Sequence, residues 1–174
     1  MKLGINGSVR EVTENSDQTA LSFLRREGMV GTKEGCASGD CGACTILVGR
    51  EISGEISYQT RNACITPINQ LAATHVVTVE GLANKEGLHP AQEAMIEKHA
   101  SQCGFCTPGF VVSIAALVEA GEASKRETVI EGISGNLCRC TGYVPIVSAG
   151  LCALKKKHKS SLKEKKLFAR LQGD

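Results

Sequence analysis

The sequence is poor in aromatic residues and in long apolar runs. Its 174 residues include no tryptophan, two tyrosines and four phenylalanines. The longest apolar stretch, Gly109 to Val118, contains a serine and is about half as long as the roughly 20-residue segment that spans a membrane. The first residues also lack the apolar segment of a signal peptide. We therefore expect a cytoplasmic protein with no membrane span.

Charge of one sign is not in large excess over the whole chain, whose net charge is +2, but it is unevenly distributed. Residues 155–174 contain seven lysines and Arg170 against two acidic residues, so this segment carries +6 and the remaining residues carry −4. A mildly acidic body does not suit general nucleic-acid binding, and we expect no nucleic-acid partner. The basic segment is interpreted as a solvated charge run, with a linker, an extension of the last helix or a patch for an acidic partner as alternatives.

Three common site motifs are also missing: the dinucleotide-binding GxGxxG, the Walker loop and the hydrolase GxSxG. Flavin, nucleotide and nucleophile sites are therefore expected in partners. The histidines follow no ligand spacing, which disfavours a Rieske centre; they are His75, His89, His99 and His158. Cysteine, in contrast, is abundant. Nine cysteines in a reducing compartment favour metal binding over disulfides.

Residues 1–82 have the pattern of a small α+β domain. Asn6-Gly7 is a strong hairpin turn signal between segments 2–5 and 8–12. A short helix is predicted around residues 21–24, ending near Gly28, and the β-branched runs 45–48 and 76–79 predict strands. Residues 83–89 have the composition of a linker.

Residues 90–158 change to helical periodicity. We predict helices at about 90–100, 108–120, 125–133 and 144–159, with Pro90, Pro108 and Pro145 in first-turn positions where proline is tolerated. Small and apolar residues on one face of the second helix suit close packing. This part is expected to form a four-helix bundle, followed by a basic C-terminal tail over residues 159–174.

Four cysteines of the first part have the spacing of a plant-type 2Fe–2S site. Cys36, Cys41 and Cys44 follow the pattern C-x4-C-x2-C, and Cys64 follows after 19 intervening residues. Glycines at 35, 39 and 42 let the loop wrap tightly and direct N–H groups at the sulfurs. A zinc site would more often show two short cysteine pairs, and a disulfide framework would need an oxidising compartment. We therefore predict a 2Fe–2S cluster here.

A second set of four cysteines lies in the helical part: Cys103, Cys106, Cys138 and Cys140. The spacing alone fits either zinc or a 2Fe–2S cluster. Cys106 and Cys140 each precede a predicted helix start, where N–H groups favour negative charge, and Thr107 and Thr141 could cap those helices. This placement favours the cluster. Cys152 has no spaced partner and is interpreted as a buried packing thiol.

Three segments resemble motifs of the xanthine dehydrogenase/aldehyde oxidase family of molybdenum hydroxylases. They are EGCASGDCGACT at 34–45, QCGFCTPG at 102–109 and GNLCRCTGY at 135–143, and the similarity extends over about residues 1–154. The chain is similar to the iron–sulfur subunit of this family, or to the iron–sulfur portion of its single-chain members. The resemblance implies an α+β architecture, with an N-terminal β-grasp ferredoxin domain followed by an all-α four-helix bundle, each holding one 2Fe–2S cluster.

The resemblance also implies a role in electron transfer without a substrate site on this chain. A molybdopterin-binding large subunit would hydroxylate the substrate. Electrons would then pass to the bundle cluster, on to the ferredoxin cluster and finally to FAD in another subunit or domain. Gln102 matches the family position that lies against the molybdenum cofactor. The segment YQTRNAC at 58–64 is similar to the xanthine dehydrogenase branch, which favours purine substrates.

Several alternatives remain open at this point. The chain could serve an aldehyde dehydrogenase or another N-heterocycle dehydrogenase of the same family. It could also be a freestanding two-cluster ferredoxin, or a zinc-binding module in which the basic tail assists contact with a partner. The basic tail itself departs from the family pattern.

Overall fold

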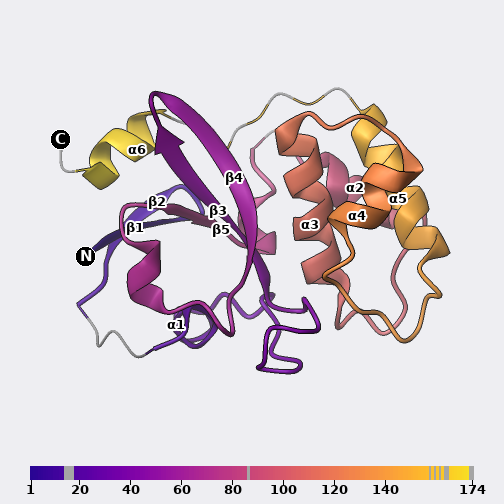
Figure 1. Ribbon diagram of the computed structural model, residues 1–174, viewed down its shortest axis with the longest axis horizontal. Helices are drawn as coiled ribbons and strands as arrows, with labels where there is room; N and C mark the ends of the chain where they lie inside the picture. Colours follow the sequence, from indigo (N-terminus) through magenta and orange to yellow (C-terminus); the bar gives the residue numbers. More distant parts are fainter. Residues whose placement is uncertain are drawn as a thin grey trace.

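The computed structural model describes residues 1–13, 18–85, 87–156, 158, 160, 162 and 165–172. Figure 1 shows a sheet with one short helix beneath it, a group of helices beside it, and a final helix that returns to the sheet. The α+β architecture expected from the sequence is confirmed. Among the described residues, none of the helices combines the length and apolar character needed to cross a membrane.

The chain begins with the expected hairpin. Strands β1 (Lys2–Ile5) and β2 (Ser8–Glu11) pair antiparallel, and Asn6 and Gly7 form the turn with φ angles of 47° and 82°. Two successive positive φ angles define the turn whose twist matches that of the flanking strands. The Gly7 N–H donates to His75 Nε2 at 3.0 Å, which fixes the turn to the neighbouring strand.

The sheet has five strands in the order β2-β1-β5-β3-β4. Strand β5 (His75–Val77) runs parallel to β1 and antiparallel to β3 (Thr45–Ile52), and β3 pairs along its whole length with β4 (Glu55–Asn62). Helix α1 (Ala20–Arg26) and the 3₁₀ turn η1 (Ile68–Leu71) contribute to the core on one face. This is the β-grasp arrangement that the resemblance implied.

Strand β3 connects the two hydrophobic cores because its side chains alternate between faces. Ile46 and Val48 pack with α1, whereas Leu47 belongs to the core of the helical part. The opposite face of the sheet is therefore covered by helix α3, which contacts both β3 and β4. The sheet domain and the helical part are therefore packed against each other through a continuous interface.

The helical part contains α2 (Pro90–Glu97), α3 (Thr107–Ala120), α4 (Arg126–Gly132) and α5 (Val144–Lys155), preceded by the turn η2 (Val79–Gly81). All four predicted helices are present. The last one is shorter than expected, because the chain leaves helical geometry at Lys156, whose ψ is 135°. Helices α2, α3 and α4 each contact α5.

The basic segment was expected to be a solvated charge run, and this interpretation is wrong for residues 165–172. They form helix α6 (Lys165–Gln172), which packs on β1 and β2. Leu167, Phe168 and Leu171 are buried, while Lys165, Lys166 and Arg170 are exposed. The lysines thus occupy one face of an amphipathic helix, whose apolar face completes the core over the sheet.

Candidate metal centres

The first cysteine set lies in the loop between α1 and β3, together with the turn after β4. Cys36 is exposed, Cys41 is half-buried, and Cys44 and Cys64 are buried. The structure brings all four together from positions up to 28 residues apart. Thiol–thiol interactions link Cys36 with Cys41 and Cys44 with Cys64, and electrostatic repulsion extends from Cys44 to Cys41.

Backbone N–H groups point at these sulfurs. Ser38 N and Cys41 N lie 3.5 and 3.4 Å from Cys36 Sγ, and Cys64 N lies 3.5 Å from Cys44 Sγ. A Cβ added to Gly35 would come within 2.9 Å of Cys41 Sγ, so any side chain there would push the sulfur out of its present position. Such N–H donors stabilise thiolate ligands of an anionic cluster.

The surroundings of Cys36 and Cys44 shift the pKa values of the two thiols in opposite directions. Hydrogen bonds from Ser38 lower the pKa of Cys36 to about 5. Burial, together with the neighbouring thiols, raises the pKa of Cys44 to about 12. A metal centre at this site must therefore displace a proton from the buried sulfur, and the positive charge of the metal supplies the driving force.

The second set lies where α3 begins and in the loop between α4 and α5. Cys103 and Cys140 are exposed, and Cys106 and Cys138 are half-buried. Here again the thiols interact as two pairs, Cys106 with Cys138 and Cys103 with Cys140. Burial raises the pKa of Cys106 to about 12, with repulsion from Cys138 and Cys103 adding to it.

The predicted threonine caps are not formed, because both side chains have other partners. Thr141 donates from N and Oγ1 to Cys138 Sγ at 3.5 and 3.1 Å. Burial alone would raise the pKa of Cys138, but these hydrogen bonds lower it. Thr107 Oγ1 pairs with Ser101 Oγ at 2.8 Å, and Cys106 takes the N-cap position of α3 without a side-chain cap.

The pairing of the sulfurs distinguishes two kinds of metal site. A single zinc ion bound by four thiolates at about 2.3 Å would hold all four sulfurs within roughly 4 Å of one another. In the described part of the chain, the group of three or more ligand atoms that all lie within 4.8 Å of each other contains no cysteine. Each set therefore lacks the single tight group that a mononuclear site requires, and its two pairs of thiols would each hold one iron of a binuclear centre.

Gln102 lies in the loop directly before Cys103, and its side chain is exposed. Two large apolar side chains beside the second cysteine set are also exposed, Phe105 at 47% and Leu137 at 56%. Cys152, expected to be buried packing, is half-buried, and its thiol donates to Glu97 Oε2 at 3.3 Å.

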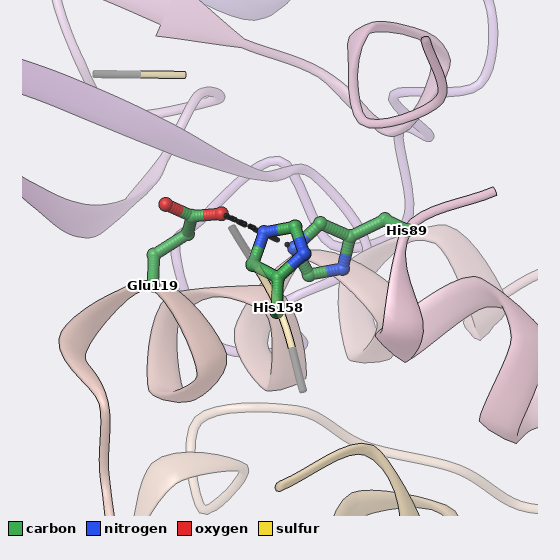
Figure 2. Close-up of side chains that lie close together, drawn as sticks. All are labelled: His89, Glu119 and His158. Carbon is green, nitrogen blue, oxygen red and sulfur yellow. Dashed lines mark hydrogen bonds and ion pairs between the residues drawn. The ribbon is translucent and has the colours of Figure 1, made fainter. Parts of the chain in front are cut away.

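A further cluster was not anticipated from the sequence. His89, Glu119 and His158 lie together, and Figure 2 shows both imidazole rings beside the Glu119 carboxylate. His89 Nε2 and His158 Nε2 lie 3.3 and 2.8 Å from Glu119 Oε1, and Ser160 Oγ donates to Oε2. The residues are 30 and 39 positions apart, so no spacing pattern could have grouped them.

The ligand types of this cluster suit a divalent cation, but its hydrogen bonds do not. His89 Nδ1 accepts the Ala91 N–H at 3.1 Å, so in the neutral ring the proton must sit on Nε2. A metal ion at Nε2 would need the lone pair there and would force a proton onto Nδ1, against the Ala91 N–H. The cluster is therefore a hydrogen-bonded carboxylate that anchors His158 and Ser160 after α5.

The fold and the two cysteine sets define a two-domain 2Fe–2S protein. The family profile of the 2Fe-2S iron-sulfur cluster binding domain matches residues 3–69, and that of the 2Fe-2S binding domain matches residues 78–151. Two families of cluster-binding domain thus follow each other along the chain.

Comparison with similar proteins identifies the family within the class of 2Fe–2S proteins. Xanthine dehydrogenase of Blastobotrys adeninivorans is 46% identical over 151 residues, or 83% of this chain, and xanthine dehydrogenase/oxidase of Gallus gallus is 46% identical over 148 residues, or 82%. The chain spans only 11% of the length of either. In the crystal structure of quinoline 2-oxidoreductase from Pseudomonas putida 86, a chain 37% identical superposes with a TM-score of 0.75, covering 88% of this chain and 91% of that one. The chain belongs to the xanthine dehydrogenase/aldehyde oxidase family and corresponds to its iron–sulfur region.

Proposed function

We propose that the chain is the electron-transfer component of a xanthine dehydrogenase-type molybdenum hydroxylase in the cytoplasm. Electrons from a molybdopterin centre in a partner subunit would enter through the helical domain, pass to the ferredoxin domain and leave to FAD. A 2Fe–2S cluster takes up and releases one electron at a time, which is the chemistry such a relay needs. The observation that carries the proposal is the presence of two paired thiol sets, one in each domain, in a chain of this family.

The ligands proposed for the two clusters are the eight cysteines in two sets. Cys36, Cys41, Cys44 and Cys64 would hold the ferredoxin-domain cluster, and Cys103, Cys106, Cys138 and Cys140 the helical-domain cluster. Their donor chemistry fits, because N–H groups face Cys36, Cys44 and Cys138, and no side chain stands between the Gly35 backbone and Cys41. The exposed Gln102, Phe105 and Leu137 would face the molybdopterin-binding partner.

A second candidate within the family is the iron–sulfur subunit of an N-heterocycle dehydrogenase. The chain covers 91% of the quinoline 2-oxidoreductase chain but 11% of the xanthine dehydrogenases. The structural match to the quinoline 2-oxidoreductase chain supports this second candidate, whereas the higher sequence identity favours the xanthine dehydrogenase branch. Isolation of the complex with its natural partner subunits, followed by turnover assays with xanthine and with quinoline, separates the two.

The test of the proposal is the metal content of the full chain. Anaerobically reconstituted protein should contain four irons and four acid-labile sulfides, be brown, and give two distinct electron paramagnetic resonance (EPR) signals on reduction. Colourless protein with stoichiometric zinc would refute it. In the native complex, molybdenum and flavin should purify with the chain; a chain that purifies alone with both clusters would instead be a freestanding ferredoxin.

A further inference from the structure

The loops that carry the two cysteine sets are joined by one backbone hydrogen bond. Leu137 N donates to Cys41 O at 3.0 Å. Cys41 belongs to the first cysteine set, and Leu137 is covalently bonded to Cys138 of the second. The bond therefore connects the two cysteine sets directly. On the helical side it begins at the backbone of Leu137, next to Cys138, and on the ferredoxin side it ends at the carbonyl of Cys41.

Asn136 holds this contact in place. Its side chain is buried at 5% exposure and spans three elements. Asn136 Nδ2 donates to Gly42 O at 3.0 Å and to Thr45 Oγ1 at 3.2 Å, both in the ferredoxin domain. Asn136 Oδ1 accepts from Ser113 Oγ of α3 at 2.7 Å, which orients the amide.

The backbones at this point touch with no side chain between them. A Cβ on Gly42, whose φ is +68°, would lie 2.3 Å from Gly135 O, and a Cβ on Gly109 would lie 2.2 Å from Gly42 O. The loop before β3, the start of α3 and the loop after α4 therefore meet at backbone contact distance. Three polar side chains inside such a contact are costly unless each is satisfied, and here each one is.

Resting on the proposed function, we infer that Asn136 is a positioning residue for electron transfer between the two clusters. Its amide ties the Gly42–Thr45 segment to the loop of Cys138 and so maintains the Leu137–Cys41 hydrogen bond. That bond is the through-bond connection along which the two redox centres couple electronically. Asn136 contacts neither cysteine sulfur through a described hydrogen bond, so its effect is on the distance and contact between the loops.

A purely structural role for Asn136 predicts different results from a positioning role. Loss of the three buried hydrogen bonds of the Asn136 side chain would lower the unfolding temperature in either case. Only the positioning role predicts that the clusters stay loaded while their interaction weakens. The readouts are therefore iron content, the spin–spin splitting between the two reduced clusters in EPR spectra, and hydrogen exchange at the amide of Leu137.

The experiment uses the full chain, reconstituted with iron and sulfide and reduced chemically, so that no partner subunit is required. In the unmodified chain we expect a splitting between the two reduced clusters. In Asn136→Ala we expect four irons per chain, faster exchange of the Leu137 amide, and loss of this splitting. The matched control is Ser134→Ala, two residues earlier and exposed, which should leave all three readouts unchanged. Unaltered splitting in Asn136→Ala with four irons would overturn the inference.

Ser113→Ala provides a second test if Asn136→Ala does not fold. It removes only the hydroxyl that orients the Asn136 amide, and a smaller loss of the same splitting is expected. Splitting identical to that of the unmodified chain would again overturn the inference. A chain that binds no iron in any variant, including the unmodified one, would instead refute the proposed function.

Discussion

Glycine at position 42 is required by two separate physical constraints, a positive φ and the absence of space for a Cβ. The conformational cost alone would be modest. A non-glycine residue in the left-handed region costs roughly 1–2 kcal/mol. A backbone atom at 2.3 Å cannot be displaced by rotating a side chain, so the loop itself must move.

We expect Gly42→Ala to destabilise the chain far more than Gly54→Ala, and to reduce binding of the ferredoxin-domain cluster. Gly54 has φ +81° but no atom within 4 Å of an added Cβ, so this control carries the conformational cost of about 1 kcal/mol without the clash. Urea unfolding and iron analysis of both variants measure the difference. Equal stability of the two would contradict the proposed backbone contact.

His75 should make the stability of the chain depend on pH. Its Nε2 accepts the Gly7 N–H, and Tyr58 Oη donates to Leu162 O at 2.7 Å, so His75 Nδ1–H must donate to Tyr58 Oη. Burial lowers the pKa of His75 to about 4. Because this is below the unfolded value of about 6.5, the stabilising contribution is complete above pH 6.5 and is lost as the pH falls towards 4.

Between pH 7.5 and 5 the loss should be about 2 kcal/mol. His75→Gln, which has no titrating ring, should be less stable overall but lose this part of the pH dependence. The control is the exposed His99, replaced by asparagine because φ there is +48°. Denaturant unfolding at pH 7.5 and pH 5 measures the free energy of unfolding of each variant. If His75→Gln kept the pH dependence of the unmodified chain, His75 would not be the group whose protonation destabilises it.

At the scale of elements, the sequence predicts the helices and turns that depend on nearby residues. It does not predict elements that form only through contacts with residues distant in the sequence. The Asn6-Gly7 hairpin, helix α1 and all four helices of the second part follow from turn residues, apolar periodicity and first-turn prolines. Strand β4 was not predicted, because its sequence, EISYQTRN, is largely polar. It is an edge strand, and only pairing with β3 makes it a strand.

The candidate sites divide in the same way. Cysteine spacing is a local signal, and it groups the eight thiols that the structure brings together. Asn136 and the His89–Glu119–His158 cluster carry no local signal, since their partners lie between 23 and 94 residues away. The burial of α6 was missed for a related reason: seven lysines dominate the composition of the segment, and its apolar residues have no partner until the sheet is formed.

Helix α6 is expected to depend on Phe168, which is fully buried and lies edge-on to His75 with ring centroids 6.2 Å apart. Phe168→Ala should cost about 3 kcal/mol or more where the helix cannot collapse into the cavity. Hydrogen exchange should accelerate in α6 and in β1–β2, but not in α3. Lys165→Ala, on the exposed face, is the control. Uniform acceleration over the whole chain would show that α6 does not open separately from the rest.

His158 and Ser160, which follow α5, are anchored at the Glu119 carboxylate. Burial opposes ionisation there, but hydrogen bonds from His89, Ser160 and His158 lower the pKa of Glu119. Glu119→Gln should therefore destabilise the cluster-loaded chain by about 2 kcal/mol. One equivalent of zinc should leave its thermal unfolding unchanged, because His89 Nδ1 is occupied by the Ala91 N–H. A zinc-dependent rise in unfolding temperature that His158→Gln abolishes would contradict this.

At the scale of the whole molecule, the tight contact between the domains makes the chain a fixed spacer between two sites. The sheet is covered by α3 on the same face that receives α6, and the two cysteine loops touch at Gly42, Gly109 and Asn136. The two cysteine sets differ in burial: Cys44 and Cys64 of the ferredoxin domain are buried, whereas the four cysteines of the helical-domain set are exposed or half-buried. The direction of electron flow between two such sites is set by the donor and the acceptor at the two ends.

The direction of electron flow can be tested in the assembled complex by removing one cluster at a time. Cys138→Ser should leave two irons per chain, and substrate should then reduce neither the remaining cluster nor the flavin. Cys64→Ser should also leave two irons, but substrate should still reduce the helical-domain cluster while the flavin stays oxidised. Cys152→Ser, outside both sets, should retain four irons and full electron transfer from substrate to flavin.

The two ligand variants, Cys138→Ser and Cys64→Ser, have equal iron content. A difference between them in which centre the substrate reduces therefore reports the order of the two clusters along the electron-transfer path. If substrate reduced the ferredoxin-domain cluster in Cys138→Ser, electrons would enter from the opposite side, and the surface of Gln102 and Leu137 would not face the molybdopterin-binding subunit.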